Sequence, residues 1–149
     1  MDKSRRDLST SAWGALLQVH AALVPVLDKR LQLETGLALS WYDVLLELSA
    51  APERRLRMSD LGERVVLSRT RVSRLVEDLV AAGLVSREVN PADARSAYAV
   101  LTPQGLARFR QAAPVYLRGI DEHFAEQLSD SELRTIARAL GRVLDANSA

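Results

Sequence analysis

Arginines and hydroxyl side chains are concentrated in one short segment in the middle of the chain. Between Arg64 and Arg74 there are four arginines and no acidic residue, although the net charge of all 149 residues is only +1. Arginine can bridge the O6 and N7 atoms of guanine, and serine or threonine can contact either bases or phosphates. The segment therefore has side chains suited to nucleic-acid binding, although a solvated arginine-rich helix face would have the same composition.

The same segment has the periodicity of an amphipathic helix. Steps of three and four residues predict one buried face, made of Val72, Leu75, Val76, Leu79 and Val80. Ser68 is the expected N-cap and Gly83 the expected end. At 100° per residue, the opposite face carries Thr70 and Arg74, with Arg71 on one side and Ser73 and Arg69 on the other.

Two of these arginines occupy positions that are unfavourable for a purely structural helix. Arg69 and Arg71 would lie in the first turn, where the helix dipole disfavours cations by about 0.3–1 kcal/mol each. An anion such as a DNA phosphate at that end would remove the penalty. We therefore interpret the segment as a recognition helix that enters the major groove.

The sequence on both sides of this helix extends the pattern. Ser59 is expected to cap a preceding short helix that runs to Val66, which gives a helix-turn-helix. After the recognition helix, two β-type runs, LVSREVN and YAVL, flank the polar connection PADARS, which predicts a hairpin. Arg95 at the tip of such a wing could enter a minor groove, and Asp93 is expected to pair with a nearby arginine and orient it.

From Leu39 to Gly105, the order of these segments resembles the MarR family of winged helix-turn-helix transcriptional regulators. The resemblance rests on LSWYDVLLEL, RMSDLGERVVLSRTRVSRLVEDLVAAGLV and NPADARSAYAVLTPQG, which includes the family's Asp-x-Arg wing tip. It implies a mainly α fold (α+β by the small wing), with residues 39–102 as the DNA-binding lobe and residues 1–38 and 103–149 as dimerisation helices. The DNA-binding residues expected from the pattern and the resemblance are Ser68, Arg69, Thr70, Arg71, Ser73, Arg74, Asp93 and Arg95.

The N-terminal third has the pattern of a long amphipathic helix followed by a shorter one. The first helix contains Pro25 and is expected to end at Gly36. Ser40 is the expected N-cap of the second helix, with Asp43 as the partner in a variant of the capping box.

The C-terminal third is also predicted to be helical. Thr102 and Pro103 are expected to begin a helix that runs to about Ser129, where a capping box with Glu132 begins the last helix. The apolar stripes at both ends of the chain exceed what one small lobe can cover. We therefore expect a homodimer, which the resemblance also implies, on a pseudo-palindromic double-stranded DNA site.

Other function classes have little support in the sequence. There is no cysteine, His20 and His123 are far apart, and neither a Gly-rich phosphate loop nor a Ser/His/Asp set stands out. We therefore expect no enzyme activity, no metal site and no cofactor. No apolar run approaches the roughly 20 residues that span a bilayer, and no secretory signal is recognisable, so we expect a cytoplasmic protein without membrane contact. The remaining alternative is a winged helix that contacts only other proteins.

The resemblance also implies a small aromatic or phenolic effector, bound where the dimerisation helices meet the DNA-binding lobe. Candidate lining residues are Trp13, His20, Trp41, Tyr42 and Tyr116, although such aromatics more often fill a core or an interface. The expected protein is a repressor that leaves its operator when a ligand favours another spacing of the lobes. Repression is the more usual outcome in the family, but activation fits the residues equally well.

Overall fold

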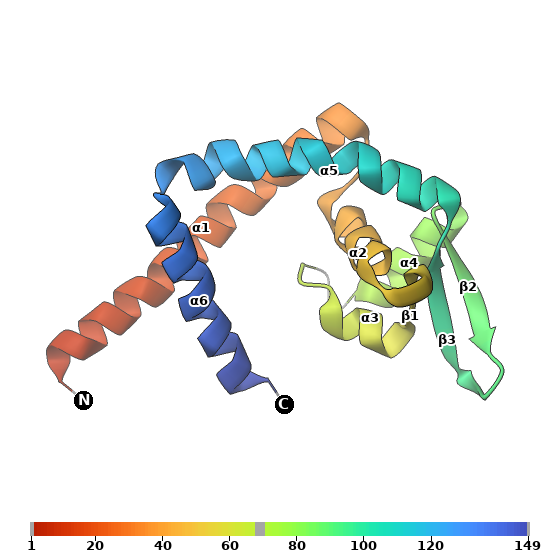
Figure 1. The fold of residues 1–149 in the computed structure, drawn as a ribbon, viewed down its shortest axis with the longest axis horizontal. Coiled ribbons are helices and arrows are strands. Elements are labelled where there is room, and N and C mark those ends of the chain that lie inside the picture. Colours follow the sequence, from red (N-terminus) through yellow and green to blue (C-terminus); the bar gives the residue numbers. More distant parts are fainter. Residues whose placement is uncertain (1, 68–70, 149) are drawn as a thin grey trace.

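The fold is mainly helical, with one small antiparallel sheet, as the sequence predicts (Figure 1). The computed structural model describes residues 2–67 and 71–148, and for Ala94 and Arg95 it describes the backbone alone. The elements in chain order are α1 (Lys3–Thr35), α2 (Leu39–Ala50), the 3-10 turn η1 (Pro52–Arg54), β1 (Arg55–Arg57), α3 (Met58–Arg64), α4 (Val72–Ala81), β2 (Val85–Asn90), β3 (Asp93–Leu101), α5 (Pro103–His123), the 3-10 turn η3 (Ala125–Gln127) and α6 (Asp130–Asn147). The strand order is β1-β3-β2.

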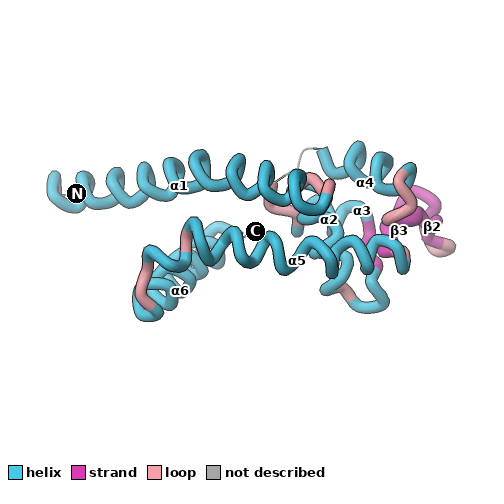
Figure 2. Tube along the Cα trace, turned by 90° about the horizontal axis from the view of Figure 1, so that it is seen from above, coloured by secondary structure: helices cyan, strands magenta, loops and turns pink. Residues whose placement is uncertain are grey.

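The elements separate into a lobe and a helical arm. Helices α2, α3 and α4 and the sheet lie together at one end of the molecule, and α5 runs from this lobe to α1 and α6 (Figure 1). The view from above shows α1 and α6 extending well away from the lobe (Figure 2). The lobe is therefore a winged helix-turn-helix, and the arm consists of the helices at the two ends of the chain.

The core of the lobe contains the apolar stripe that the sequence predicts for α4. Val76 and Leu79 are completely buried, and Val72 and Leu75 are half-buried against the same core. Val80 stays 38% exposed, so the buried stripe is narrower than expected. The helix ends as predicted, because Gly83 adopts a φ of 80° that favours glycine.

The junction between the lobe and α5 depends on a close backbone approach. Thr102 donates its hydroxyl to the Gly83 carbonyl at 2.7 Å and accepts the Gly105 N–H at 3.0 Å. A Cβ atom on Gly105 would lie 2.0 Å from the Leu84 carbonyl oxygen, so only glycine fits there. Thr102 and Pro103 therefore begin α5 as predicted, and they also join it to the end of α4.

The second half of the arm also begins as predicted. Ser129 and Glu132 form the expected capping box of α6, with both reciprocal hydrogen bonds present. The preceding helix α5 ends at His123 rather than near Ser129, because η3 interrupts it.

Four expected details near α2 and α3 are wrong or fall outside the described residues. Ser59, the expected cap of α3, lies inside that helix, whose N-cap is Arg57. Ser40 lies inside α2, whose N-cap is Ala38 without a side-chain bond; Asp28 Oδ1 accepts the Leu39 N–H instead, at 2.9 Å. Helix α3 ends at Arg64, so Val66 lies in the following turn. The predicted N-cap Ser68 lies outside the described residues.

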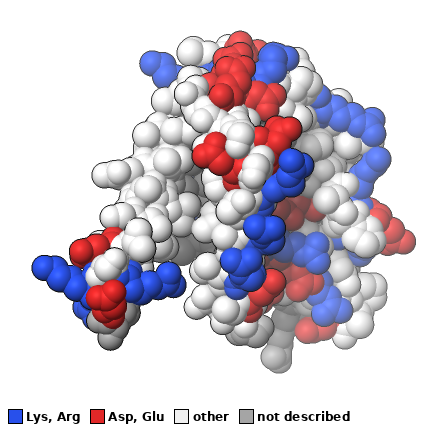
Figure 3. All heavy atoms as spheres, turned by 60° about the vertical axis from the view of Figure 1, so that its left-hand side comes forward, with Lys and Arg blue, Asp and Glu red and all other residues white. Residues whose placement is uncertain are grey.

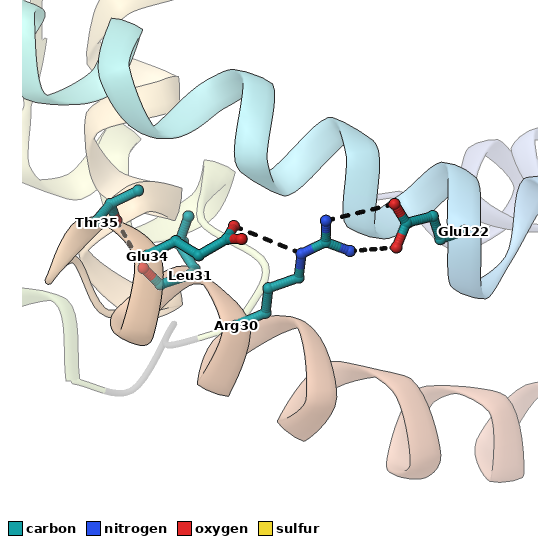
Figure 4. Close-up of polar contacts among 5 residues, drawn as sticks. All are labelled: Arg30, Leu31, Glu34, Thr35 and Glu122. Carbon is teal, nitrogen blue, oxygen red and sulfur yellow. Dashed lines mark hydrogen bonds and ion pairs between the residues drawn. The ribbon is translucent and has the colours of Figure 1, made fainter.

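Helix α1 ends at Gly36 as predicted, with a φ of 74°, and it is attached to α5. The Arg30 guanidinium forms a two-pronged contact with Glu122, with Nη1–Oε2 at 2.5 Å and Nη2–Oε1 at 3.4 Å (Figure 4). Arg30 also contacts Glu34 at 3.5 Å on its own helix. The hydrogen bond from Arg30 lowers the pKa of the Glu122 carboxyl.

The hydropathy of α1 corrects one expectation from the sequence. An 18-residue window of this helix has a mean hydropathy of 1.3, so by length and composition alone it is apolar enough to cross a membrane. The expectation that no apolar run approaches that length is therefore wrong. Only 6% of the window is buried within one copy of the chain, which leaves most of its side chains uncovered.

We predict that Gly105→Ala lowers the free energy of unfolding by about 1–3 kcal/mol, because the new methyl group collides with the Leu84 backbone. Urea unfolding followed by circular dichroism measures this change. Gly141→Ala in α6 is the matched control, since a Cβ there meets nothing within 4 Å, and it should be neutral or slightly stabilising. Equal stability of both variants would contradict the role of Gly105.

We predict that Glu122→Gln removes a pH-dependent part of the stability. The folded-state pKa of Glu122 lies below the ordinary value of 4.5, so the wild type is favoured over the variant above that pH. This advantage shrinks as the pH falls through the lowered pKa. Thermal melts between pH 7 and pH 3 measure the difference, with Glu126→Gln at an exposed neighbouring glutamate as control. A difference that is constant with pH would count against the ion pair.

Candidate nucleic-acid interface

The described part of the recognition helix presents polar side chains opposite its buried face. Arg71, Ser73 and Arg74 are exposed, whereas Val76 and Leu79 are buried. Arg71 stands at the N-cap, and the first turn of α4 has no acidic residue. Among the described residues, the helix dipole therefore meets the Arg71 cation and the Ser73 hydroxyl at this end, an arrangement that suits an anion such as phosphate.

Three of the candidate residues lie outside the described part of the chain. They are Ser68, Arg69 and Thr70, which immediately precede Arg71. Helix α4 is described from Val72, four residues after the expected N-cap. The described residues therefore include only the second part of the predicted reading face.

The predicted wing is a hairpin of β2 and β3, with Asn90 opposite Asp93 across a two-residue turn. Asn90 is buried, and its side-chain oxygen accepts the Ala92 N–H at 3.0 Å, which stabilises the turn. Asp93 is exposed at the tip. Arg95 lies in β3, and its side chain is outside the described part of the structure.

Two arginines on β1, which the sequence did not single out, lie beside the wing. Arg55 stacks over the Tyr98 ring at 4.2 Å and pairs with Glu88 at 3.2 Å. Arg57 Nε donates to the Tyr98 hydroxyl at 3.5 Å. This contact raises the pKa of Arg57, and the charges of Asp60 and Asp93 add to the effect. The charge of Asp93 thus acts on Arg57, and the expected pairing of Asp93 with an arginine stays a prediction.

A cavity of about 220 Å³ lies where the arm meets the lobe. Two of the candidate effector residues, Tyr42 and Tyr116, line it with their ring centroids 4.9 Å apart. The other lining residues are Val24, Leu39, Asp43, Leu46, Glu47, Val66 and Leu67. Trp13, His20 and Trp41 do not line this cavity, and Trp13 is 61% exposed on the distant part of α1.

The cavity disfavours negative charge. Burial raises the pKa of the Tyr42 and Tyr116 hydroxyls, and the neighbouring Tyr116 and Asp43 add to the respective shifts. Burial also raises the pKa of Glu47, with a contribution from Asp43. The two phenols are therefore neutral hydrogen-bonding groups. Within residues 2–67 and 71–148, no cluster of three or more His, Asp or Glu could hold a metal ion.

A second surface, on the arm, is apolar and uncovered. Exposed large side chains on α1 and α6 include Leu8, Trp13, Leu16, Leu17, Val19, Leu140, Val143 and Leu144. An apolar groove of about 370 Å³ lies between the two helices, lined by residues such as Leu16, Val19, Ile136 and Leu140. One face of the molecule has a broad uncharged area between two groups of charged side chains (Figure 3). So many exposed apolar residues indicate an interaction surface.

Comparison of the sequence and comparison of the structure with known proteins give the same result. A family model described as MarR family matches residues 35–96. AbsC, a MarR family transcriptional regulator from Streptomyces coelicolor, is 34% identical, with 94% of each chain covered and a TM-score of 0.83. Sco3205, a MarR family regulator from the same organism solved in complex with DNA, is 27% identical over 94% of this chain and 88% of its own, with a TM-score of 0.85.

A curated relative gives the same result from sequence alone. The transcriptional repressor YetL of Bacillus subtilis is 28% identical over 110 residues. The match covers 74% of this chain and 65% of the repressor, so it spans just under two thirds of that protein's length. With the winged lobe, the exposed basic face of α4 and a 34% identical relative matched over 94% of its length, the chain belongs to the MarR family of DNA-binding transcriptional regulators.

Proposed function

We propose that two copies of this chain form a homodimer that binds a pseudo-palindromic operator and represses transcription, and that a small aromatic or phenolic ligand releases it. The observation that carries this proposal is the exposed Arg71, Ser73 and Arg74 on one face of α4, with the wing beside them. Repression is the function named for the relative YetL. Since the operator is genomic DNA, the proposed place of action is the cytoplasm.

In this proposal, α4 enters the major groove and the wing reaches the adjacent minor groove. Arg74 and Ser73 face the bases, whereas Arg71 at the helix N-terminus is better placed for a phosphate. Ser68, Arg69, Thr70 and Arg95 complete the set, as the sequence predicts. Asp93 orients an arginine near the wing, and Arg57 is the candidate for that arginine.

The exposed apolar surface of α1 and α6 supports a second copy as its cover. These helices belong to the two terminal segments, residues 1–38 and 103–149, which we assign to dimerisation. Each copy adds one DNA-reading lobe, and two-fold symmetry sets the half-sites about one helical turn apart. One lobe alone offers few base contacts, so the dimer is needed for a specific site.

The cavity beside Tyr42 and Tyr116 supports a neutral aromatic ligand. Two phenols can exchange hydrogen bonds with a ligand hydroxyl, and the leucine and valine side chains suit an apolar ring. The cavity is bordered by α1, α2, α5 and the turn before α4. A ligand that fits best at a different lobe spacing would lower DNA affinity by its preference for that state.

We predict that Arg74→Ala costs about 1–3 kcal/mol of binding to the specific operator and relaxes base preference at one position of each half-site. Fluorescence anisotropy with a duplex selected from a random library measures this change. Arg134→Ala, at an exposed arginine of α6, is the control and should leave affinity unchanged. An equal loss on every sequence would instead assign Arg74 to a phosphate. Binding to no duplex at all by the wild type would favour a protein-contact module.

We predict that the wild type sediments as a dimer at micromolar concentration and that Leu144→Asp raises the dissociation constant at least about 100-fold. The change removes about 1.5–3 kcal/mol of apolar burial from each copy of the interface and adds a charge. Val89→Asp is the matched control, because Val89 is equally exposed but lies on the wing. A wild-type monomer, or equal effects of both variants, would contradict this interface.

A further inference from the structure

The turn between α3 and α4 is held by a side chain of α2. Asp43 Oδ2 accepts the backbone N–H groups of Val66 and Leu67, each at 2.9 Å. Helix α3 has already ended, because its last hydrogen bond joins the Val65 N–H to the Leu61 carbonyl. The two following N–H groups therefore have no acceptor within the helix, and a single carboxylate oxygen satisfies both.

Asp43 is itself buried, on a helix whose inward side chains form part of the core. Asp43 is only 7% exposed, and Leu45 and Leu48 on the same helix are completely buried. The neighbouring Tyr42 ring packs against Phe109 and Tyr116 of α5, with centroid distances of 5.3 and 4.9 Å. Asp43 therefore connects the turn to the central part of the fold rather than to a mobile surface segment.

The turn precedes the helix that carries the reading residues. A fixed pair of hydrogen bonds at Val66 and Leu67 restricts the direction in which the chain enters α4. Base recognition tolerates an error of only about 0.5 Å or 10–20° in the position of a contacting side chain. A small rotation of α4 about this turn would therefore affect base contacts more than phosphate contacts, which flexible arginines can still reach.

We propose that Asp43 is a positioning residue for DNA reading: without touching DNA, it fixes the orientation of α4 by accepting two hydrogen bonds from the turn before it. The inference rests on the proposed function of α4 as the reading helix. It also gives the cavity a physical connection to that helix, because Asp43, Val66 and Leu67 all line it. A molecule in the cavity would contact the residues that form these hydrogen bonds.

The experiment compares Asp43→Ala, Asp43→Asn and the wild type on two DNA ligands, the selected operator and a random duplex. Asp43→Ala should weaken operator binding about 10-fold or more while changing random-duplex binding less than about 2-fold, with an unchanged salt slope. Asp43→Asn should recover operator binding to within about 3-fold, because its amide oxygen can still accept both N–H groups. Amide hydrogen exchange at Val66 and Leu67 should be slow in the wild type and faster in Asp43→Ala.

Two controls separate positioning from general destabilisation. Asp28→Ala removes another carboxylate that accepts a backbone N–H, that of Leu39 at 2.9 Å at the start of α2, and leaves the Val66 and Leu67 bonds in place. Glu47→Gln alters the same cavity wall and leaves the turn intact. Both should keep the ratio of operator to random-duplex affinity at the wild-type value, because loss of folded protein lowers the two affinities equally.

If folded Asp43→Ala keeps the wild-type ratio of operator to random-duplex affinity, this inference is overturned and the proposed function is not. If the wild type itself prefers no duplex, the proposed function and this inference are overturned together. If Asp43→Ala does not fold, Asp43→Asn decides. The positioning role is supported if Asp43→Asn keeps both operator affinity and slow exchange at Val66 and Leu67, or if it loses both. Loss of either one without the other overturns it.

Discussion

Burial of the inner face of α2 is the constraint on which the rest of the structure depends. Its inward residues, Leu45 and Leu48, are completely buried, so the helix cannot move without opening the core. Tyr42 contacts α5 on one side, and Asp43 holds the turn before α4 on another. The recognition helix and the arm are therefore both positioned against the same central element.

The two candidate interaction surfaces have opposite physical character and are joined by α5. The reading face of α4 is exposed and polar, with Arg71 and Arg74, whereas the arm exposes apolar residues such as Leu16 and Leu144. Gly105 fixes the start of α5 on the lobe, and Glu122 near its other end pairs with Arg30 of α1. In a dimer, this continuous helix would transmit the geometry of the interface to the spacing of the two lobes. Regulation by a ligand at the cavity would act on the same spacing.

The features that the sequence predicted most accurately are those that depend on residues close together in the chain. The glycine ends at Gly36 and Gly83 and the capping box at Ser129 were confirmed, and so was the apolar stripe of α4 except at Val80. Each is decided within about one turn of helix, so local sequence contains the necessary information. The hairpin was confirmed for the same reason. The choice of residues for base contact follows from helix periodicity, and it stays a prediction.

By itself, the sequence determined the family, the order of elements and the polar face of the recognition helix, because residue type and spacing specify local structure. Only the tertiary structure decided what the buried polar groups do. Asp43 looked like a capping residue for its own helix, yet it bonds Val66 and Leu67, 23 and 24 residues away. Arg30 and Glu122 pair across 92 residues. Such partners are brought together only when the chain packs, and no periodicity within one segment records them.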